Sequence, residues 1–169
     1  TGNNSRSKVQ AQSPSTPWLT IAYCATQATT SGDICSVASG SYAEDVGTGA
    51  AGSAGNLINF TGNSVAKVRR FGMNHNYTQV DGFIFDYALS DYSMYVTVSA
   101  NYVSVTNNTF NHPGVQEVWS VRMPIYTGIN YATISGNTMT NNRAAGGFDI
   151  HGSGHIITLN MVNGYYDDP

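Results

Sequence analysis

The sequence carries little charge for its length. Of its 169 residues, 7 are Lys or Arg and 10 are Asp or Glu, so charged residues make up 10% of the chain. An average globular domain contains roughly 25%. A nucleic-acid-binding surface needs clustered Lys and Arg to displace counterions from phosphates. The net charge of −3 therefore argues against nucleic acid as a partner.

Long apolar runs and good helix formers are also scarce. No apolar run approaches the roughly 18 residues of a membrane span. The chain does not open with the charged and apolar regions of a signal peptide, so any such leader is expected to have been removed already. Few Glu, Lys and Leu residues exclude a helical bundle. The abundant residues are instead 18 Gly, 17 Asn and 11 Tyr, which favour an all-β protein.

The length suits one domain, predicted over residues 1–169. Residues 1–17 are polar and are expected to form an extended lead-in. Residues 18–29 are predicted to form the one convincing helix, with Thr16 as its N-cap and Pro17 as its first residue.

The remainder, residues 30–169, aligns with itself. Four segments of similar pattern begin 25, 29 and 25 residues apart, at residues 76–85, 101–110, 130–139 and 155–164. Each segment has an apolar or aromatic residue at its second position and an apolar residue three positions later. The first set is Tyr77, Tyr102, Tyr131 and Ile156, and the second is Val80, Val105, Ile134 and Leu159. Three copies add Phe85, Phe110 and Met139.

These positions are predicted to stack from coil to coil as internal ladders, because side chains alternate between the two faces of a strand. Asn-rich turns tolerate left-handed backbone, and their amides can bond along a stack as an asparagine ladder. Such a fixed register favours a solenoid of β-coils. A β-sandwich is the alternative, but its strands would show no such register.

Three segments resemble right-handed parallel β-helix proteins of the pectate-lyase-like superfamily. They are residues 18–22, residues 31–42 (SGDICSVASGSY) and residues 52–60 (GSAGNLINF). In that superfamily a helix caps the first coil, a GD–strand–GxY element follows, and a GTAGNPI-like turn starts the regular coils. The resemblance implies an all-β, right-handed parallel β-helix with an N-terminal capping helix. It does not imply one activity, because such folds include lyases, hydrolases, phage spikes and non-catalytic surface proteins.

The two cysteines lie on the predicted helix and the first predicted strand. Because these elements should pack together, a Cys24–Cys35 disulfide is favoured over two buried thiols. A sparsely charged, Asn-rich solenoid is typical of exported proteins, so a secreted or cell-surface location is expected. Two cysteines without histidines at ligand spacing do not form a zinc site.

The candidate site comes from the strands that precede each repeat. Phe71, Val96, Val121 and Ile150 are predicted to form an inward row, with an insertion after Val121. The flanking outward positions then gather polar residues. The candidate catalytic residues are Arg122, His151, Asp149 and Tyr126, and the candidate substrate-binding residues are Arg70, Tyr95 and Glu117. Arg can bind a uronate carboxylate, and His, Tyr or Arg can remove a sugar proton. Solvated side chains and simple ion pairs are the alternative interpretation of this surface.

No cofactor is expected. Asp81, Asp86 and Asp91 form the one acidic cluster in the coils, but they lack the loop pattern of a calcium site, so calcium is only weakly indicated. Residues 146–157 resemble a late-coil element of alginate- and chondroitin-lyase-type β-helices. The Lys and Arg motifs of those lyases and the paired Asp of polygalacturonases have no match.

Two functions are therefore carried forward. The first is non-catalytic binding of carbohydrate or a surface, and the second is lyase-like cleavage of an acidic polysaccharide by β-elimination. Because residues 165–169 follow the last repeat without a capping element, two outcomes are expected. Either the natural protein continues beyond residue 169, or two copies form a homodimer through the last coil.

Overall fold

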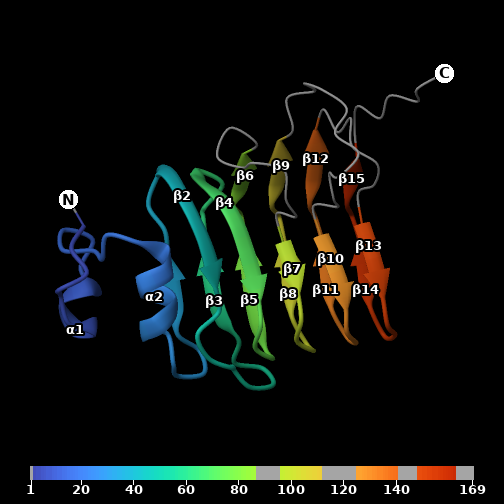
Figure 1. Cartoon of the computed structure of the whole chain (residues 1–169), viewed down its shortest axis with the longest axis horizontal. Coiled ribbons are helices and arrows are strands. Elements are labelled where there is room, and N and C mark those ends of the chain that lie inside the picture. Colours follow the sequence, from blue (N-terminus) through green and yellow to red (C-terminus); the bar gives the residue numbers. More distant parts are fainter. Residues whose placement is uncertain (1, 87–95, 112–124, 141–147, 163–169) are drawn as a thin grey trace.

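Parallel strands wind into a right-handed solenoid of about four turns, with two short helices at its N-terminal end (Figure 1). The computed structural model describes residues 2–86, 96–111, 125–140 and 148–162. The first sheet stacks six strands in the order β1 (Ile34–Ser36), β3 (Ile58–Thr61), β5 (Thr78–Asp81), β8 (Ser104–Thr106), β11 (Thr133–Ser135) and β14 (Ile156–Thr158). This architecture confirms the predicted fold class.

The second sheet divides into two arms at one long strand. The early part of β4 (Ala66–Met73) pairs with β6, and its late part pairs with β7. The first arm contains β6 (Ile84–Asp86), β9 (Thr109–Asn111), β12 (Thr138–Thr140) and β15 (Met161–Val162). The second arm contains β7 (Val96–Val98), β10 (Ile125–Gly128) and β13 (Phe148–His151), while β2 (Gly40–Gly47) pairs with β4.

Apolar side chains fill the interior because alternate residues of every strand point inward. In the first sheet the inward row is Cys35, Phe60, Val80, Val105, Ile134 and Ile157. In the first arm Phe85 pairs with Phe110, and Phe110 pairs with Met139. The Phe85 and Phe110 rings are stacked with their centroids 4.8 Å apart, close to the strand spacing of about 4.8 Å.

The predicted repeat is confirmed for three copies and is wrong by two residues in the fourth. Ile157, rather than Leu159, pairs with Ile134, and Val162 pairs with Met139. Leu159 instead lies in a turn and is 87% exposed. The last repeat is therefore 23 residues long rather than 25, and matching residue types alone did not reveal this shorter length.

A row of asparagine amides closes the corner between the first sheet and the first arm. The side chains of Asn108, Asn137 and Asn160 form this buried asparagine ladder. Asn108 Oδ1 accepts from the backbone N–H of Phe83 at 2.9 Å, and Asn108 Nδ2 donates to the carbonyl oxygen of Val80 at 3.0 Å and to Asn137 Oδ1 at 3.1 Å. Asn137 repeats the same contacts one coil further on. The ladder thereby satisfies backbone groups that the sheets leave unpaired at each corner.

Each corner of the ladder has only two residues between strands. In these four coils the first of the two residues has left-handed backbone, with φ of +64° at Gly82, +54° at Asn107, +67° at Gly136 and +56° at Leu159. Gly and Asn adopt this conformation readily, whereas Leu is strained there. The corner sequences in successive coils are Gly-Phe, Asn-Asn, Gly-Asn and Leu-Asn. The first three begin with a residue that suits this backbone, and the last begins with the strained Leu159.

The helix predicted at residues 18–29 begins later and ends earlier. It is α2 (Ile21–Gln27), and its N-cap is Thr20, whose side chain accepts from the Tyr23 N–H. Glu44 of β2 also accepts from the Ile21 and Ala22 N–H groups, so Thr16 and Pro17 lie outside the helix. The lead-in also differs from the extended segment expected, because it contains the helical turn α1 (Lys8–Ala11) with a Ser7–Gln10 capping box.

Helix α2 covers the open end of the first coil. Ile21 and Ala25 are buried against the core, and the Cys24–Cys35 disulfide joins the helix to β1 with a Cα–Cα distance of 6.1 Å. The predicted disulfide is confirmed. It holds the N-terminal helix against the first strand.

We expect Asn108→Ala to lower the free energy of unfolding by about 3 kcal/mol, because the Phe83 N–H and the Val80 carbonyl lose their partners in the core. Urea denaturation followed by circular dichroism measures the change. Asn76→Ala is the matched control, because Asn76 caps the exposed N–H of Asn101 in a similar way. Its expected cost is about 1 kcal/mol or less. Equal effects of the two substitutions would contradict a special role for the buried ladder.

Replacing both cysteines, Cys24→Ala with Cys35→Ala, is expected to lower the unfolding free energy by about 3 kcal/mol. The disulfide closes a short loop with a sequence separation of 11, and its removal increases the entropy of the unfolded chain. Reduction of the wild-type protein with a thiol reagent should lower the urea midpoint as far as the double substitution does. A double variant that unfolds at the wild-type midpoint would show that the bridge is energetically neutral.

Candidate functional site

The outer face of the second arm presents polar side chains from successive coils. Gly72 of β4 pairs with Thr97 of β7, Thr97 pairs with Tyr126 of β10, and Tyr126 pairs with Asp149 of β13. The next outward position along the arm contains Ser99 just after β7, Gly128 and His151. We call the outward residues Thr97, Ser99, Gly128, Asp149 and His151 the polar face.

The register of this face corrects one step of the sequence prediction. Ile125, and not Val121, lies opposite Val96, so the four-residue insertion precedes β10 instead of following Val121. The predicted pairing of Phe71 with Val96 is confirmed. Ile150 points inward as expected, but it pairs with Thr127 two residues further along the arm. Asp149 therefore lies beside Tyr126, and His151 lies beside Gly128.

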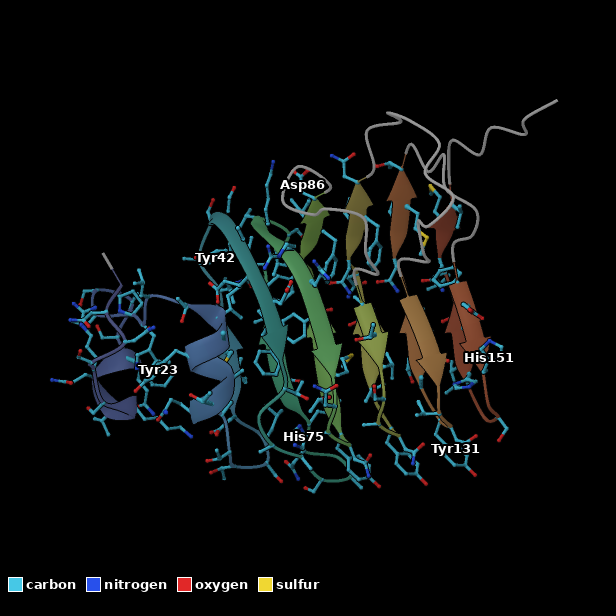
Figure 2. The ribbon with its side chains drawn as sticks, in the orientation of Figure 1. Tyr23, Tyr42, His75, Asp86, Tyr131 and His151 are labelled. Carbon is cyan, nitrogen blue, oxygen red and sulfur yellow. A yellow bond between two sulfur atoms is a disulfide. The ribbon has the colours of Figure 1, made fainter. Side chains whose placement is uncertain are left out.

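Asp149 and His151 form an ion pair on β13. They are two residues apart, so both point outward while Phe148 and Ile150 pack against the core. The Nε2–H of His151 donates to Asp149 Oδ1 at 2.7 Å, and the side chains are 65% and 33% exposed. Figure 2 shows His151 on β13 at the C-terminal end of the solenoid. The contact places Asp149 where it can orient the imidazole ring and stabilise its charged form, so the two side chains have the chemistry of a base with its orienting carboxylate.

Arg70 lies away from this pair. It precedes Gly72 on β4, three strand spacings or about 14 Å from the row of Asp149. Arg70 Nε lies 3.2 Å from Asp45 Oδ1 of β2, and Arg69 Nε lies 2.9 Å from the same oxygen. A carboxylate of the protein itself is therefore already placed between these two guanidinium groups.

The other predicted site residues are not fully placed by the structure. Tyr95, Glu117 and Arg122 lie outside the described residues, as does Asp91 of the acidic cluster. The backbone of Tyr126 is described and lies in β10 beside Asp149. Among the predicted catalytic residues, Asp149 and His151 are the two that the described part of the chain brings into contact.

The remaining acidic residues of the cluster make contacts of their own. Asp81 Oδ1 accepts from the Thr106 hydroxyl at 2.6 Å and from the Asn107 amide at 2.8 Å. Asp86 is paired with Lys67 at 2.9 Å. Within residues 2–86, 96–111, 125–140 and 148–162, no group of three or more His, Cys, Asp or Glu residues is arranged to hold a metal ion.

Within the described ranges, the pKa values of one carboxyl group and one phenol group are shifted, and both groups belong to the N-terminal end of the solenoid. Burial tends to raise the pKa of Asp33, but hydrogen bonds from Lys8 and the Thr30 backbone N–H outweigh it and lower that pKa. Burial, together with the negative charge of Glu44, raises the pKa of Tyr42. Neither group faces the polar face, because both lie in or before β2.

Sequence reasoning placed one prominent feature on the wrong side of the coil. Tyr77, Tyr102 and Tyr131 were expected to point inward, but they form an external tyrosine stack. The Tyr77 and Tyr102 ring centroids are 4.9 Å apart at an interplanar angle of 6°, and those of Tyr102 and Tyr131 are 5.0 Å apart at 3°. Their backbone is left-handed, with φ of +56°, +56° and +60°, and this turns each ring away from the core.

The repeated Asn-Tyr dipeptide could have indicated this turn. Asn76, Asn101 and Asn130 precede the three tyrosines, and each Asn side chain accepts the backbone N–H of the residue stacked in the next coil, the last of which is Ser153. Left-handed backbone costs a non-glycine residue about 1–2 kcal/mol. Each stacked aromatic pair gains about 0.5–1.5 kcal/mol beyond burial. Stacking therefore offsets only part of the backbone strain.

The last described coil exposes apolar side chains. Ile157 is 48% exposed and Val162 is 41% exposed, whereas their partners Ile134 and Met139 in the previous coil are buried. The homodimer expected from the sequence stays a prediction. Across the part of the chain that the structure describes, no helix combines the length and apolar character needed to cross a membrane.

No family model matches the chain, and no significant match is found among curated proteins or solved structures. The fold therefore stands on the strand pairing itself, and the resemblance to the pectate-lyase-like superfamily stays an expectation.

Proposed function

We propose that the protein binds a carbohydrate chain along the polar face, across the strands of the second arm. The observation that carries the proposal is the register, which stacks Thr97, Asp149 and the neighbouring position of Tyr126 at one-strand intervals. Hydroxyl, carboxylate and imidazole groups at regular intervals suit a ligand that is itself a repeating polymer with many hydroxyl groups. The small residues Gly72, Ser99 and Gly128 give such a chain room to approach the backbone.

The charge distribution supports carbohydrate over nucleic acid as the ligand. Three of the basic residues, Lys67, Arg69 and Arg70, are paired with acidic residues of this chain. A phosphate backbone would have to compete with these carboxylates for the same side chains. The hydroxyl groups of Thr97 and Ser99 on the polar face can bind a sugar without displacing a carboxylate from these basic side chains.

The proposal includes an extracellular location. A disulfide persists in oxidising compartments, so the Cys24–Cys35 bridge is compatible with an extracellular protein. Polysaccharides of cell walls and surfaces would be accessible to the polar face there.

Isothermal titration against hexasaccharides tests the binding proposal. The panel contains neutral cello-, xylo- and manno-hexaose and acidic oligogalacturonate and oligoalginate. Thr97→Lys places a long side chain in the middle of the polar face and should weaken binding roughly tenfold or more, a loss of about 1.4 kcal/mol.

Thr133→Lys is the matched control, because Thr133 is an outward residue of β11 in the first sheet, away from the polar face. It should bind as the wild type does. The proposal fails if the wild type binds no member of the panel, or if both lysine variants bind with unchanged affinity.

The second candidate function is β-elimination, favoured by the Asp149–His151 ion pair together with the resemblance to polysaccharide lyases. In this reaction Nδ1 of His151 removes the C5 proton of a uronate. The C4–C5 double bond forms as the C4–O bond breaks, and a proton passes to the leaving oxygen. Asp149 stabilises the imidazolium ion formed in the first step. Arg122 is the residue proposed from the sequence to bind the uronate carboxylate.

Ultraviolet absorbance of the unsaturated product tests this second function, with alginate, pectate and chondroitin as substrates, each with and without Ca²⁺. His151→Ala and Arg122→Ala should abolish any activity, whereas His75→Ala at a distant turn should retain it. Absence of product from all substrates rules out the lyase. Product formation that survives His151→Ala removes His151 from the reaction.

A further inference from the structure

The tyrosine stack ends at a glycine. The turn position that holds Tyr77, Tyr102 and Tyr131 in three successive coils holds Gly154 in the next, also with left-handed backbone, φ +71°. Gly154 lies directly against the last ring, because a Cβ atom added there would be 2.5 Å from Cδ1 of Tyr131. The stack therefore has no fourth side chain on the C-terminal side of Tyr131.

Exposure increases along the stack toward this glycine. Tyr102 is covered by a ring on each face and is 42% exposed, whereas Tyr131 has a ring on one face only and is 50% exposed. Figure 2 shows Tyr131 at the turn edge of the solenoid, next to the coil that carries His151. The face of Tyr131 that points toward this coil is therefore one of the two end faces of the stack, and it belongs to the more exposed end.

Polar residues lie close to Gly154 along the same turn. Ser153 precedes Gly154, and its backbone N–H and hydroxyl both donate to Asn130 Oδ1, at 2.9 and 3.0 Å. His151 lies two residues further back, at the end of the polar face, and its carbonyl accepts from His155 Nε2 at 3.2 Å. An exposed aromatic ring on a turn that also carries hydroxyl, amide and imidazole groups suits a sugar ring, which has an apolar C–H face and a polar rim.

We infer that a pyranose ring of the bound carbohydrate stacks on Tyr131 beside Gly154, in the place a fourth tyrosine would take. The inference rests on the proposed function and extends it, because it assigns the stacking residue and one end of the binding path. Backbone strain supports it. Three tyrosines occupy left-handed positions that glycine would fill without strain, so the exposed rings are retained at a cost that ring stacking only partly offsets.

The stack also explains why the glycine follows it. An added Cβ at Gly154 would meet the Tyr131 ring, so any side chain there would displace the ring or cover its face. Glycine alone keeps both the turn conformation and the open aromatic surface. The neighbouring Tyr102 ring, stacked in turn on Tyr77, holds Tyr131 in a fixed orientation, so little conformational entropy is lost when a sugar binds.

Titration of the same hexasaccharide panel with four variants tests the inference. Tyr131→Ala removes the stacking surface and should weaken binding roughly tenfold, as truncation of an aromatic anchor commonly does. Tyr131→Phe keeps the ring and should bind within about twofold of the wild type. Gly154→Asn tolerates left-handed backbone but covers the ring face, and it should lose affinity as Tyr131→Ala does.

Tyr77→Ala is the matched control, because it removes a ring from the opposite end of the stack and should leave affinity unchanged. Circular dichroism and the urea midpoint verify that each variant is folded. In NMR spectra of the wild type, the ring protons of Tyr131 should shift on sugar addition and those of Tyr77 should not.

The outcomes separate this inference from the proposed function. If the wild type binds no hexasaccharide, the proposed function fails and the stacking role fails with it. If the wild type binds, Thr97→Lys loses affinity, and Tyr131→Ala and Gly154→Asn bind normally, the polar face stands and the stacking role is overturned. Loss of affinity in both of these variants with retention in Tyr131→Phe establishes it.

Discussion

The buried asparagine ladder is the interaction on which the solenoid depends. At each corner of the ladder the chain turns with only two residues, and the N–H of the second residue (Phe83, Asn108 or Asn137) bonds to an asparagine side chain instead of a backbone carbonyl. Asn108 and Asn137 supply the missing donors and acceptors, each bonding to the coil on one side and to the next amide on the other. The ladder thus fixes the register of successive coils, and every outward row of side chains, including the polar face, inherits that register.

The polar face and the tyrosine stack are two results of the same stacking. A parallel solenoid repeats whatever a position contains at one-strand intervals, inside and outside alike. Inside, repetition gives rows such as Phe85 and Phe110; outside, it gives the three tyrosines and the row from Thr97 to Asp149. The clearest break in this repetition is Gly154, which follows three tyrosines at the same turn position.

The sequence was sufficient for the architecture because its apolar pattern recurs with nearly constant spacing, and because Cys24 and Cys35 fell on elements that must pack together. Its limits were local. The fourth repeat and the strand β10 were misaligned because coil length changes at segments that matching residue types could not locate. The tyrosines were placed inside because an aromatic residue at a repeated position resembles a core residue. A positive φ, which a Tyr adopts rarely, gave no signal in the composition.

The two-residue corner restricts where this chain can accept insertions. Equivalent residues Val80, Val105, Ile134 and Ile157 follow one another at 25, 29 and 23 residues, yet every corner of the ladder keeps two residues. All the difference falls between the first arm and the second, in the stretches joining β6 to β7, β9 to β10 and β12 to β13. Among these four repeats the chain length therefore varies only before the strands that carry the polar face. New ligand specificities can evolve, or be engineered, by grafting loops into these joining stretches.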